Sequence, residues 1–169
     1  PLDQVTPLIL TFNEEANISR TLAGLRWARR IVVVDSFSTD ATLELLAQCP
    51  QVEVVQRAFD SFAEQCNFGL QLIRTPWCLS LDADHLITPA FQAELVELVA
   101  AAPADVAAVL TPFRYCVQGK PLRGTLLPPR FNLIRPAGGH YLNDGHAHRF
   151  LPSSRTLAMH QPILHDDRK

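Results

Sequence analysis

Apolar runs of strand length alternate with helically spaced apolar residues along the first 102 residues. The strand-like runs are Val5–Thr11, Arg30–Asp35, Val52–Val55 and Trp77–Leu81. Apolar residues at helical spacing follow each run, around residues 18–25, 43–47, 62–74 and 89–99. Strands separated by helices of this length predict an α/β fold, with a mostly parallel, Rossmann-like sheet flanked by helices.

Polar residues mark where three of these helices are expected to begin. Asn13 is expected to cap the first helix, and Ser61 with Glu64 forms a capping box for the third. The third helix is expected to run to about Arg74. Thr88, which precedes a proline, is expected to cap the fourth. These caps support the helices that the spacing predicts.

The pattern changes after residue 102. Val106–Tyr115 is predicted to be a strand, Gln118–Pro129 a loop or hairpin, and Phe131–Arg135 another strand. Residues 138–169 show no regular pattern and hold five of the six histidines. This last part of the chain is therefore predicted to be loop-like.

Composition excludes several classes of protein. The net charge is −2 without a basic block, so nucleic acid is not an expected partner. No apolar run approaches the roughly 20 residues that span a bilayer, and no secretory signal is visible. The four cysteines match no zinc signature and suit a reducing, cytoplasmic setting. The length of 169 residues predicts a single domain, with a regular part at 1–102 and a less regular part at 103–169.

Two carboxylates follow the predicted strand Trp77–Leu81. Asp82 and Asp84 are one residue apart, so alternation along the strand places both on one face. Adjacent carboxylates repel each other, and a hard divalent cation that carries a diphosphate would satisfy both. The alternative is that one aspartate caps the next turn while the other is solvated. Further segments of the chain favour the cation site.

Polar residues also end the other predicted strands. Thr11 and Glu14 end or follow the first strand, and Asp35 ends the second. The carboxyl ends of parallel strands meet at one edge of a sheet, so these residues are expected to lie near Asp82 and Asp84. Such a cluster offers acceptors for a ribose, for a base N–H and for a cation. Neither a GxGxxG motif nor a P-loop occurs, so a phosphate ligand would need a metal bridge.

These motifs resemble those of the inverting glycosyltransferases of family two, and in particular those of lipopolysaccharide-core β-glucosyltransferases. The likeness covers residues 5–100 well and the rest loosely. The segments that carry it are Thr11–Glu15, Val33–Thr42, Gln65–Leu70, Trp77–Asp84 and His165–Lys169. Each motif is weak alone, but four of them in order at compatible spacing are specific.

The resemblance implies that residues 1–102 bind a nucleotide sugar and that 103–169 supply the acceptor site and catalysis. It implies donor contacts from Thr11, Glu14, Asp35, Asn67, Asp82 and Asp84. The first three would contact the uridine part, and Asn67 would lie near the diphosphate or the sugar. Asp84 would bind Mn²⁺ or Mg²⁺, and Asp82 would reach the metal or the ribose. The plain alternatives are a turn-forming Asp35, a Glu14 that interacts with a helix dipole, and a solvated Asn67.

The residue that would take the proton of the attacking hydroxyl departs from the family pattern. Where the family has a histidine followed by glutamate, His148 is followed by Arg149. Asp144, His146 and His148 are the candidates for the base, and His148 is also a candidate metal ligand. Alternatively, the domain has lost turnover and only binds a nucleotide sugar. By the same resemblance, His165–Lys169 is expected to fold back toward the donor.

The sequence therefore predicts a metal-dependent inverting glycosyltransferase that moves a sugar from a nucleotide sugar, with UDP-sugar the expected donor, to a glycan or lipid-linked acceptor. A sugar nucleotidyltransferase ranks below it, because the segment after the first strand is acidic where a triphosphate needs a basic, glycine-rich loop. A lipid-linked acceptor would bring this cytoplasmic protein to the inner face of a bacterial membrane. The pattern leaves the oligomeric state open.

Overall fold

The computed structural model describes residues 1–124, 127–145 and 147–169. Its helices are the 3₁₀ turn η1 (Leu2–Gln4) and the α-helices α1 (Ile18–Ala23), α2 (Thr42–Ala47), α3 (Phe62–Gln71) and α4 (Pro89–Ala101). Its strands are β1 (Val5–Thr11), β2 (Ile31–Asp35), β3 (Val52–Gln56), β4 (Trp77–Asp82), β5 (His85–Leu86), β6 (Val106–Thr111), β7 (Phe113–Val117), β8 (Lys120–Pro121), β9 (Arg130–Ile134), β10 (Gly139–Asp144), β11 (Ala147–Pro152), β12 (Arg155–Ala158) and β13 (Ile163–His165). No helix in the described part of the chain is both long and apolar enough to cross a membrane.

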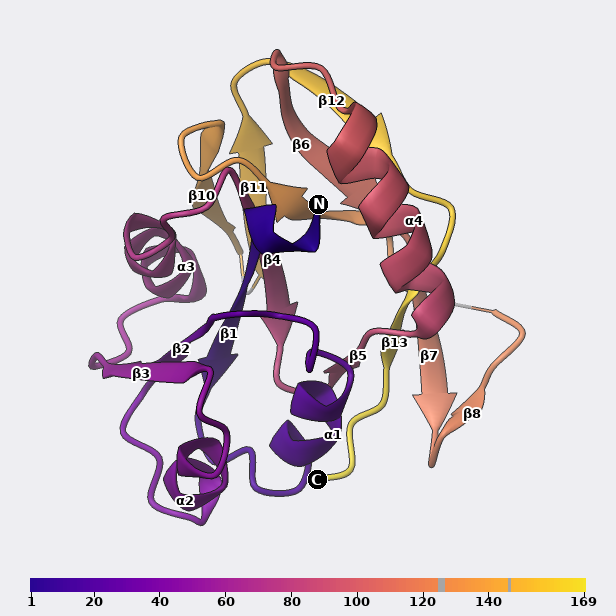
Figure 1. The fold of residues 1–169 in the computed structure, drawn as a ribbon. Helices are drawn as coiled ribbons and strands as arrows, with labels where there is room; N and C mark the ends of the chain where they lie inside the picture. Colours follow the sequence, from indigo (N-terminus) through magenta and orange to yellow (C-terminus); the bar gives the residue numbers. More distant parts are fainter. Residues whose placement is uncertain (125–126, 146) are drawn as a thin grey trace.

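A seven-stranded sheet forms the centre of the fold (Figure 1). Its strand order is β12-β6-β9-β4-β1-β2-β3, and four of the six neighbouring pairs are parallel. The predicted α/β fold with a mostly parallel sheet is thus confirmed. Thr11 lies opposite Asp35, and Leu10 lies opposite Asp82, so the ends of β1, β2 and β4 meet at one edge of the sheet.

Apolar side chains cover both faces of this sheet. On one face α1, α2 and α4 pack through residues such as Leu22, Leu46 and Phe91. On the other face α3 packs together with the β10–β11 hairpin, through residues such as Leu70 and Phe150. Burial of each such side chain contributes about 1.5–3 kcal/mol relative to exposure. Packing on both faces fixes the strand ends that carry the polar residues.

Ser61 and Thr88 cap their helices as predicted, but the capping box is only half formed, because the Ser61 N–H donates to Asp60 Oδ1 at 2.7 Å and not to Glu64. The Ser61 hydroxyl accepts a hydrogen bond from the Glu64 N–H at 3.2 Å, and the Thr88 hydroxyl accepts one from the Phe91 N–H at 3.1 Å. Each bond satisfies an N–H that has no partner within its own helix. Helix α3 ends at Gln71, a few residues before the predicted end.

The prediction that Asn13 caps the first helix is wrong. Helix α1 begins after Asn17, and Asn13 adopts a left-handed backbone conformation with φ of 52°. Its side-chain oxygen accepts a hydrogen bond from the Thr39 N–H at 2.8 Å. Asn13 therefore joins the loop after β1 to the loop after β2, because a short amide side chain tolerates this backbone and bonds locally.

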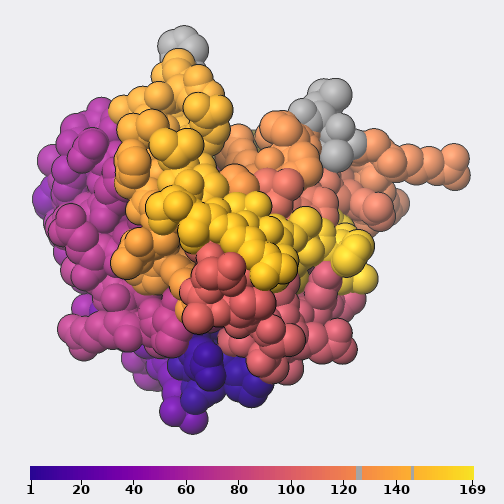
Figure 2. Space-filling model, turned by 90° about the horizontal axis from the view of Figure 1, so that it is seen from above, coloured from indigo at the N-terminus to yellow at the C-terminus, as the bar shows by residue number. Residues whose placement is uncertain are grey.

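The prediction that residues 138–169 are loop-like is also wrong, because they form β10 to β13. β10 and β11 pair as an antiparallel hairpin, and β13 lies between β5 and β7. The predicted strand Val106–Tyr115 is interrupted at Pro112, which has no N–H to donate, and so becomes β6 and β7 in different sheets. The segment predicted as a loop or hairpin, Gln118–Pro129, supplies β8, which pairs with β7 in a hairpin that projects from the body (Figure 2). Thr125 and Leu126 of this segment lie outside the described residues.

Candidate active site

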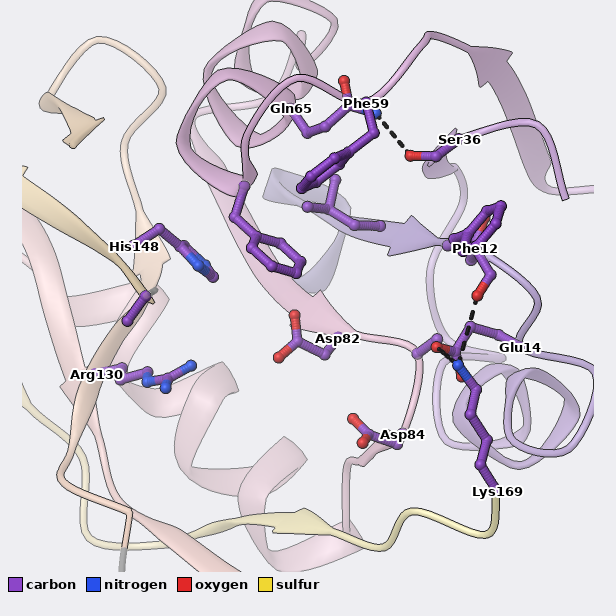
Figure 3. A pocket seen from close by; sticks show the side chains of 15 residues that line it. Phe12, Glu14, Ser36, Phe59, Gln65, Asp82, Asp84, Arg130, His148 and Lys169 are labelled. Atoms are coloured by element: carbon purple, nitrogen blue, oxygen red, sulfur yellow. Dashed lines mark hydrogen bonds and ion pairs between the residues drawn. The ribbon is translucent and has the colours of Figure 1, made fainter. Parts of the chain in front are cut away.

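A cavity of about 860 Å³ opens where β1 and β4 end (Figure 3). Asp82 and Asp84 point into it, and His148 and Arg130 face them from the opposite wall. Its remaining walls are Leu10, Thr11, Phe12, Glu14, Ser36, Phe59, Phe62, Gln65, Ala83, Ala147 and Lys169. A cavity of this volume can enclose a ligand as large as a drug-sized molecule.

A second cavity of about 270 Å³ adjoins the first. The two share Asp82, Arg130, Ala147 and His148 in their linings. Asp144 and Arg149 line the second cavity. Two ligands could therefore lie side by side, with Asp82 and His148 at their junction.

Asp84 lies beside two histidines that the sheet topology brings to it. Its Oδ2 is 3.4 Å from His165 Nε2, and its Oδ1 is 3.9 Å from His85 Nε2. One ligand atom from each of the three residues lies within 4.8 Å of the others. Asp84 Oδ1 and His165 Nδ1 are buried, and neither has a hydrogen-bond partner among the residues that the structure describes. Buried polar atoms without partners are rare, and a bound cation would satisfy this carboxylate.

Burial sets the charges of this cluster. It raises the pKa of Asp84 to about 6, against the opposing effect of His165. It lowers the pKa of His85 to about 4, so this ring is neutral at pH 7. His85 Nδ1 accepts a hydrogen bond from the Asp82 N–H at 2.9 Å, and we therefore assign the ring proton to Nε2. His85 then points an N–H toward Asp82 Oδ2, 3.5 Å away.

The predicted donor residues at the ends of β1 and β2 differ in whether they reach the cavity. Thr11 and Glu14 line the larger cavity, whereas the Asp35 side chain is fully buried. Asp35 accepts hydrogen bonds from Thr11 Oγ1 at 2.7 Å, Ser38 N at 2.9 Å and Gln56 Nε2 at 3.2 Å. Burial acts to raise the pKa of Asp35, but these hydrogen bonds outweigh it and lower the pKa. Here Asp35 fixes the loop after β2, and its contact with a uridine stays a prediction.

Asn67 lies on α3 against the β10–β11 hairpin. Its side chain accepts a hydrogen bond from the Tyr141 N–H at 2.8 Å and donates one to the Tyr141 carbonyl at 3.0 Å. Asn67 is not among the residues that line either cavity. Its amide instead attaches the hairpin to α3, and a place near the diphosphate stays a prediction. The sequence carries no signal for this pairing, since the two residues are 74 positions apart.

His148 comes from β11 and lines both cavities. Its ring stacks on Phe62, with centroids 5.5 Å apart. Burial lowers the pKa of His148, so the ring is neutral at pH 7 and can accept a proton. Asp144 lies at the end of β10 in the second cavity, while His146 lies outside the described residues.

The segment His165–Lys169 folds back onto the start of α1. The Asp166 side chain is buried and pairs with Arg20 at 3.2 Å. Asn17 accepts a hydrogen bond from the Arg168 N–H at 2.9 Å. Lys169 Nζ lies 2.6 Å from Glu14 Oε1 at the cavity wall, in line with the expected return toward the site (Figure 3). Sequence reasoning missed Asn17 and Arg20, whose types and positions are ordinary for a helix start.

A parallel sheet whose strand ends present carboxylates to a deep cavity is the usual arrangement of a ligand site in an open α/β fold. The family model "Glycosyl transferase family 2" matches residues 8–154, and the chain belongs to this family. Lipopolysaccharide core biosynthesis glycosyltransferase LpsC of Rhizobium meliloti (strain 1021) is 33% identical over 102 residues, which cover 57% of this chain and 37% of LpsC. The predicted likeness to lipopolysaccharide-core enzymes is thereby confirmed. An uncharacterized glycosyltransferase of Rickettsia bellii (strain RML369-C) is 29% identical over 103 residues, covering 60% of this chain and 35% of that protein.

Solved structures of nucleotide-sugar transferases share the fold. S. aureus TarS 1-349 in complex with UDP-GlcNAc superposes with a TM-score of 0.73 at 15% identity, covering 98% of this chain and 59% of that one. The mannosyltransferase PcManGT from Pyrobaculum calidifontis, in complex with GDP-Man and Mn²⁺, has a TM-score of 0.56 at 28% identity, covering 66% and 36%. The chain spans about a third of the length of the curated relatives it matches.

Proposed function

We propose that this chain carries the donor site and catalytic edge of a metal-dependent inverting glycosyltransferase that uses a nucleotide sugar, with a UDP-sugar as the expected donor. The observation that carries the proposal is the buried Asp84 Oδ1, which has no hydrogen-bond partner in the described part of the chain and lies beside an imidazole at the cavity. The complex of PcManGT with GDP-Man and Mn²⁺ supports the same class of ligand.

The residues at the sheet edge fit a divalent cation. Asp84 and His165 would hold it, and Asp82 lies at the same edge of the cavity. An imidazole beside carboxylates favours Mn²⁺ over Mg²⁺, because first-row transition metals bind nitrogen ligands more tightly. When bound, the cation would neutralise the negative charge that develops on the departing diphosphate.

Arg130 offers a second positive group at the junction of the two cavities. Its guanidinium makes no ion pair or hydrogen bond to the described residues, and it lies 6.0 Å from the centre of the Phe113 ring. An arginine in this position can bind a phosphate oxygen of the donor or an anionic group of the acceptor.

The second cavity is the proposed entrance of the acceptor hydroxyl. His148 lies between the cavities and is neutral at pH 7, because burial lowers its pKa. It would take the proton of the attacking hydroxyl, with Asp84 on the donor side and Asp82 at the junction. Asp144, which lines the second cavity, is the alternative base. The likeness to LpsC supports a glycan or lipid-linked glycan as acceptor.

A second candidate function is nucleotide-sugar binding without turnover, which Arg149 favours because it replaces the expected acid. Arg149 lines the second cavity and brings a positive charge where a base would be needed. Donor binding with Mn²⁺ but without sugar transfer or slow donor hydrolysis would support this candidate. Transfer to an acceptor would exclude it.

The function can be tested by measuring thermal unfolding in the presence of a panel of nucleotide sugars, each with and without Mn²⁺. A ligand that binds the folded state raises the melting temperature, by an amount equivalent to about 2.7 kcal/mol at a hundred times its Kd. We expect a shift that needs both a UDP-sugar and Mn²⁺ and that disappears in Asp84→Asn. No shift with any nucleotide sugar would overturn the proposal.

A further inference from the structure

One stretch of the chain carries cations without any acid. Residues 106–143 contain five basic residues, while all 17 acidic residues lie outside this stretch. The five are Arg114, Lys120, Arg123, Arg130 and Arg135. Since the chain as a whole has a charge of −2, this part is opposite in charge to the rest of the protein.

The β7–β8 hairpin projects from the body (Figures 1 and 2). Arg114 and Lys120 lie on its strands, and Arg123 follows two residues after β8. Gln118 and Gly119 form its two-residue turn, with φ of 48° and 81°. Such positive values at both central positions belong to tight hairpin turns that match the strand twist. The tip is therefore a defined structure.

Large apolar side chains lie next to these cations. Val117 is 59% exposed and Leu122 is 46% exposed. Val117 lies opposite Lys120, and the Leu122 N–H donates to the Tyr115 carbonyl at 2.8 Å. Side chains alternate along a strand, and directly opposite residues share a face. Val117, Lys120 and Leu122 therefore lie on one face of the ribbon, whereas Arg114 shares the other face with Cys116 and Pro121.

The three cations of the hairpin have no acidic partners. Arg114, Lys120 and Arg123 are exposed, and none of them forms an ion pair with the residues that the structure describes. Exposed apolar side chains beside unpaired cations match the interface of an anionic lipid bilayer. Apolar groups enter its acyl boundary there, while cations meet phosphate headgroups.

We propose that the β7–β8 hairpin docks this protein onto an anionic lipid surface. Val117 and Leu122 would enter the interface, Lys120 would bind headgroup phosphates on the same face, and Arg114 and Arg123 would bind them from the other side of the ribbon. Charge complementarity selects this occupant: an acid-free, basic ribbon is attracted by anionic lipid, whereas the acidic remainder of the chain is repelled. The inference does not depend on the proposed transferase function.

The hairpin is joined to the candidate active site by backbone contacts. β7 pairs in parallel with β13, so that Tyr115 lies beside His165. At the tip, the Gly119 N–H donates a hydrogen bond to Asp166 Oδ2 at 2.9 Å. A docked hairpin would therefore hold the edge that carries His165 close to the lipid surface.

The test is co-sedimentation of the protein with vesicles of phosphatidylcholine alone and of phosphatidylcholine with 30% phosphatidylglycerol, at about 50 and 500 mM NaCl. We expect binding to the anionic vesicles at low salt and a marked loss at high salt. Lys120→Glu with Arg123→Glu should lower the partition coefficient at least about tenfold. Val117→Ser with Leu122→Ser should lower it at least about fivefold.

The matched control is Arg26→Glu with Arg29→Glu, which changes the net charge equally at two exposed positions outside the basic stretch. This control should bind within about twofold of the wild type. The hairpin variants should keep the wild-type melting temperature and the nucleotide-sugar-dependent shift, which separates docking from donor binding. Absence of binding to anionic vesicles, equal binding to neutral vesicles, or an equal loss in the control would overturn the proposal.

Discussion

Two carboxylates at the same sheet edge differ in how the protein uses them. Asp35, at the end of β2, is fully buried and accepts hydrogen bonds from Thr11, Ser38 and Gln56. Asp84, just beyond β4, keeps a buried oxygen without a hydrogen-bond partner in the described structure. A fully bonded carboxylate stabilises the fold, whereas a desolvated and unpartnered one costs stability until a ligand binds. The contrast distinguishes residues that hold the site together, such as Asp35, from residues that are available to bind a ligand, such as Asp84.

The largest effect is expected at His148, which belongs to the ligand-facing group. His148→Gln should reduce sugar transfer by roughly 10²- to 10⁴-fold, because the neutral ring that accepts the acceptor's proton is lost. Donor affinity, measured by calorimetry with Mn²⁺, should change by less than about threefold, since the amide fills similar space. Unchanged transfer would assign the base to another residue, and the same measurement on Asp144→Asn would then identify it.

Asp84→Asn should weaken Mn²⁺-dependent donor binding by about a hundredfold, because the amide cannot supply an anionic ligand. The stability of the metal-free protein, in contrast, should not fall. Burial raises the pKa of Asp84 to about 6, so the group is mostly ionised at pH 7 and its ionisation lowers the stability of the fold. The metal-free melting temperature of the variant should therefore equal or exceed that of the wild type. A marked fall would place Asp84 among the residues that hold the site together.

Asp35→Asn, unlike Asp84→Asn, should lower the stability of the fold. It should lower the free energy of unfolding by about 1–3 kcal/mol, measured in urea, because a charged acceptor of several hydrogen bonds is removed. The folded-state pKa of Asp35 lies below its ordinary value, so its stabilisation is complete at neutral pH and is lost as the pH falls through that lowered value. Between about pH 5 and 3, wild-type stability should thus fall more steeply than that of the variant. Parallel curves would contradict the account.

The smallest effect is expected at the partly exposed Lys169, which pairs with Glu14 at the cavity wall. Lys169→Met should weaken donor binding only about two- to fivefold, because exposed ion pairs are screened by water and salt. The melting temperature should stay within about 1 °C of the wild type. A loss as large as that of Asp84→Asn would move Lys169 into the essential part of the site.

The parallel part of the fold was predictable because its strands are continuous apolar runs. Ile31–Asp35 is buried at every position, and such runs are typical of strands covered on both faces. β10 buries Tyr141 while most of its other residues are exposed, so its apolar pattern is too weak to indicate a strand. It is held instead by Asn67 and by pairing with β11, and both contacts are tertiary.

The candidate site was predictable to the extent that topology alone assembles it. Asp82 and Asp84 were expected at the carboxyl end of a parallel strand, and they lie there. The position of His165 beside Asp84 depends on the pairing of β13 with β5 and β7, which follows from no local pattern. The hydrogen bonds that hold Asp35 in place likewise include a tertiary contact, from Gln56 on β3, that no local pattern predicts.

The central claim is that Asp84 and His165 bind a divalent cation that a nucleotide diphosphate shares. It is tested most directly by pulsed electron paramagnetic resonance of Mn²⁺ bound to the protein with UDP. We predict bound Mn²⁺ with nitrogen modulation from one imidazole, which disappears in His165→Gln and persists in the exposed-histidine control His160→Gln. Absence of bound Mn²⁺, or nitrogen modulation that survives in His165→Gln, would contradict the account.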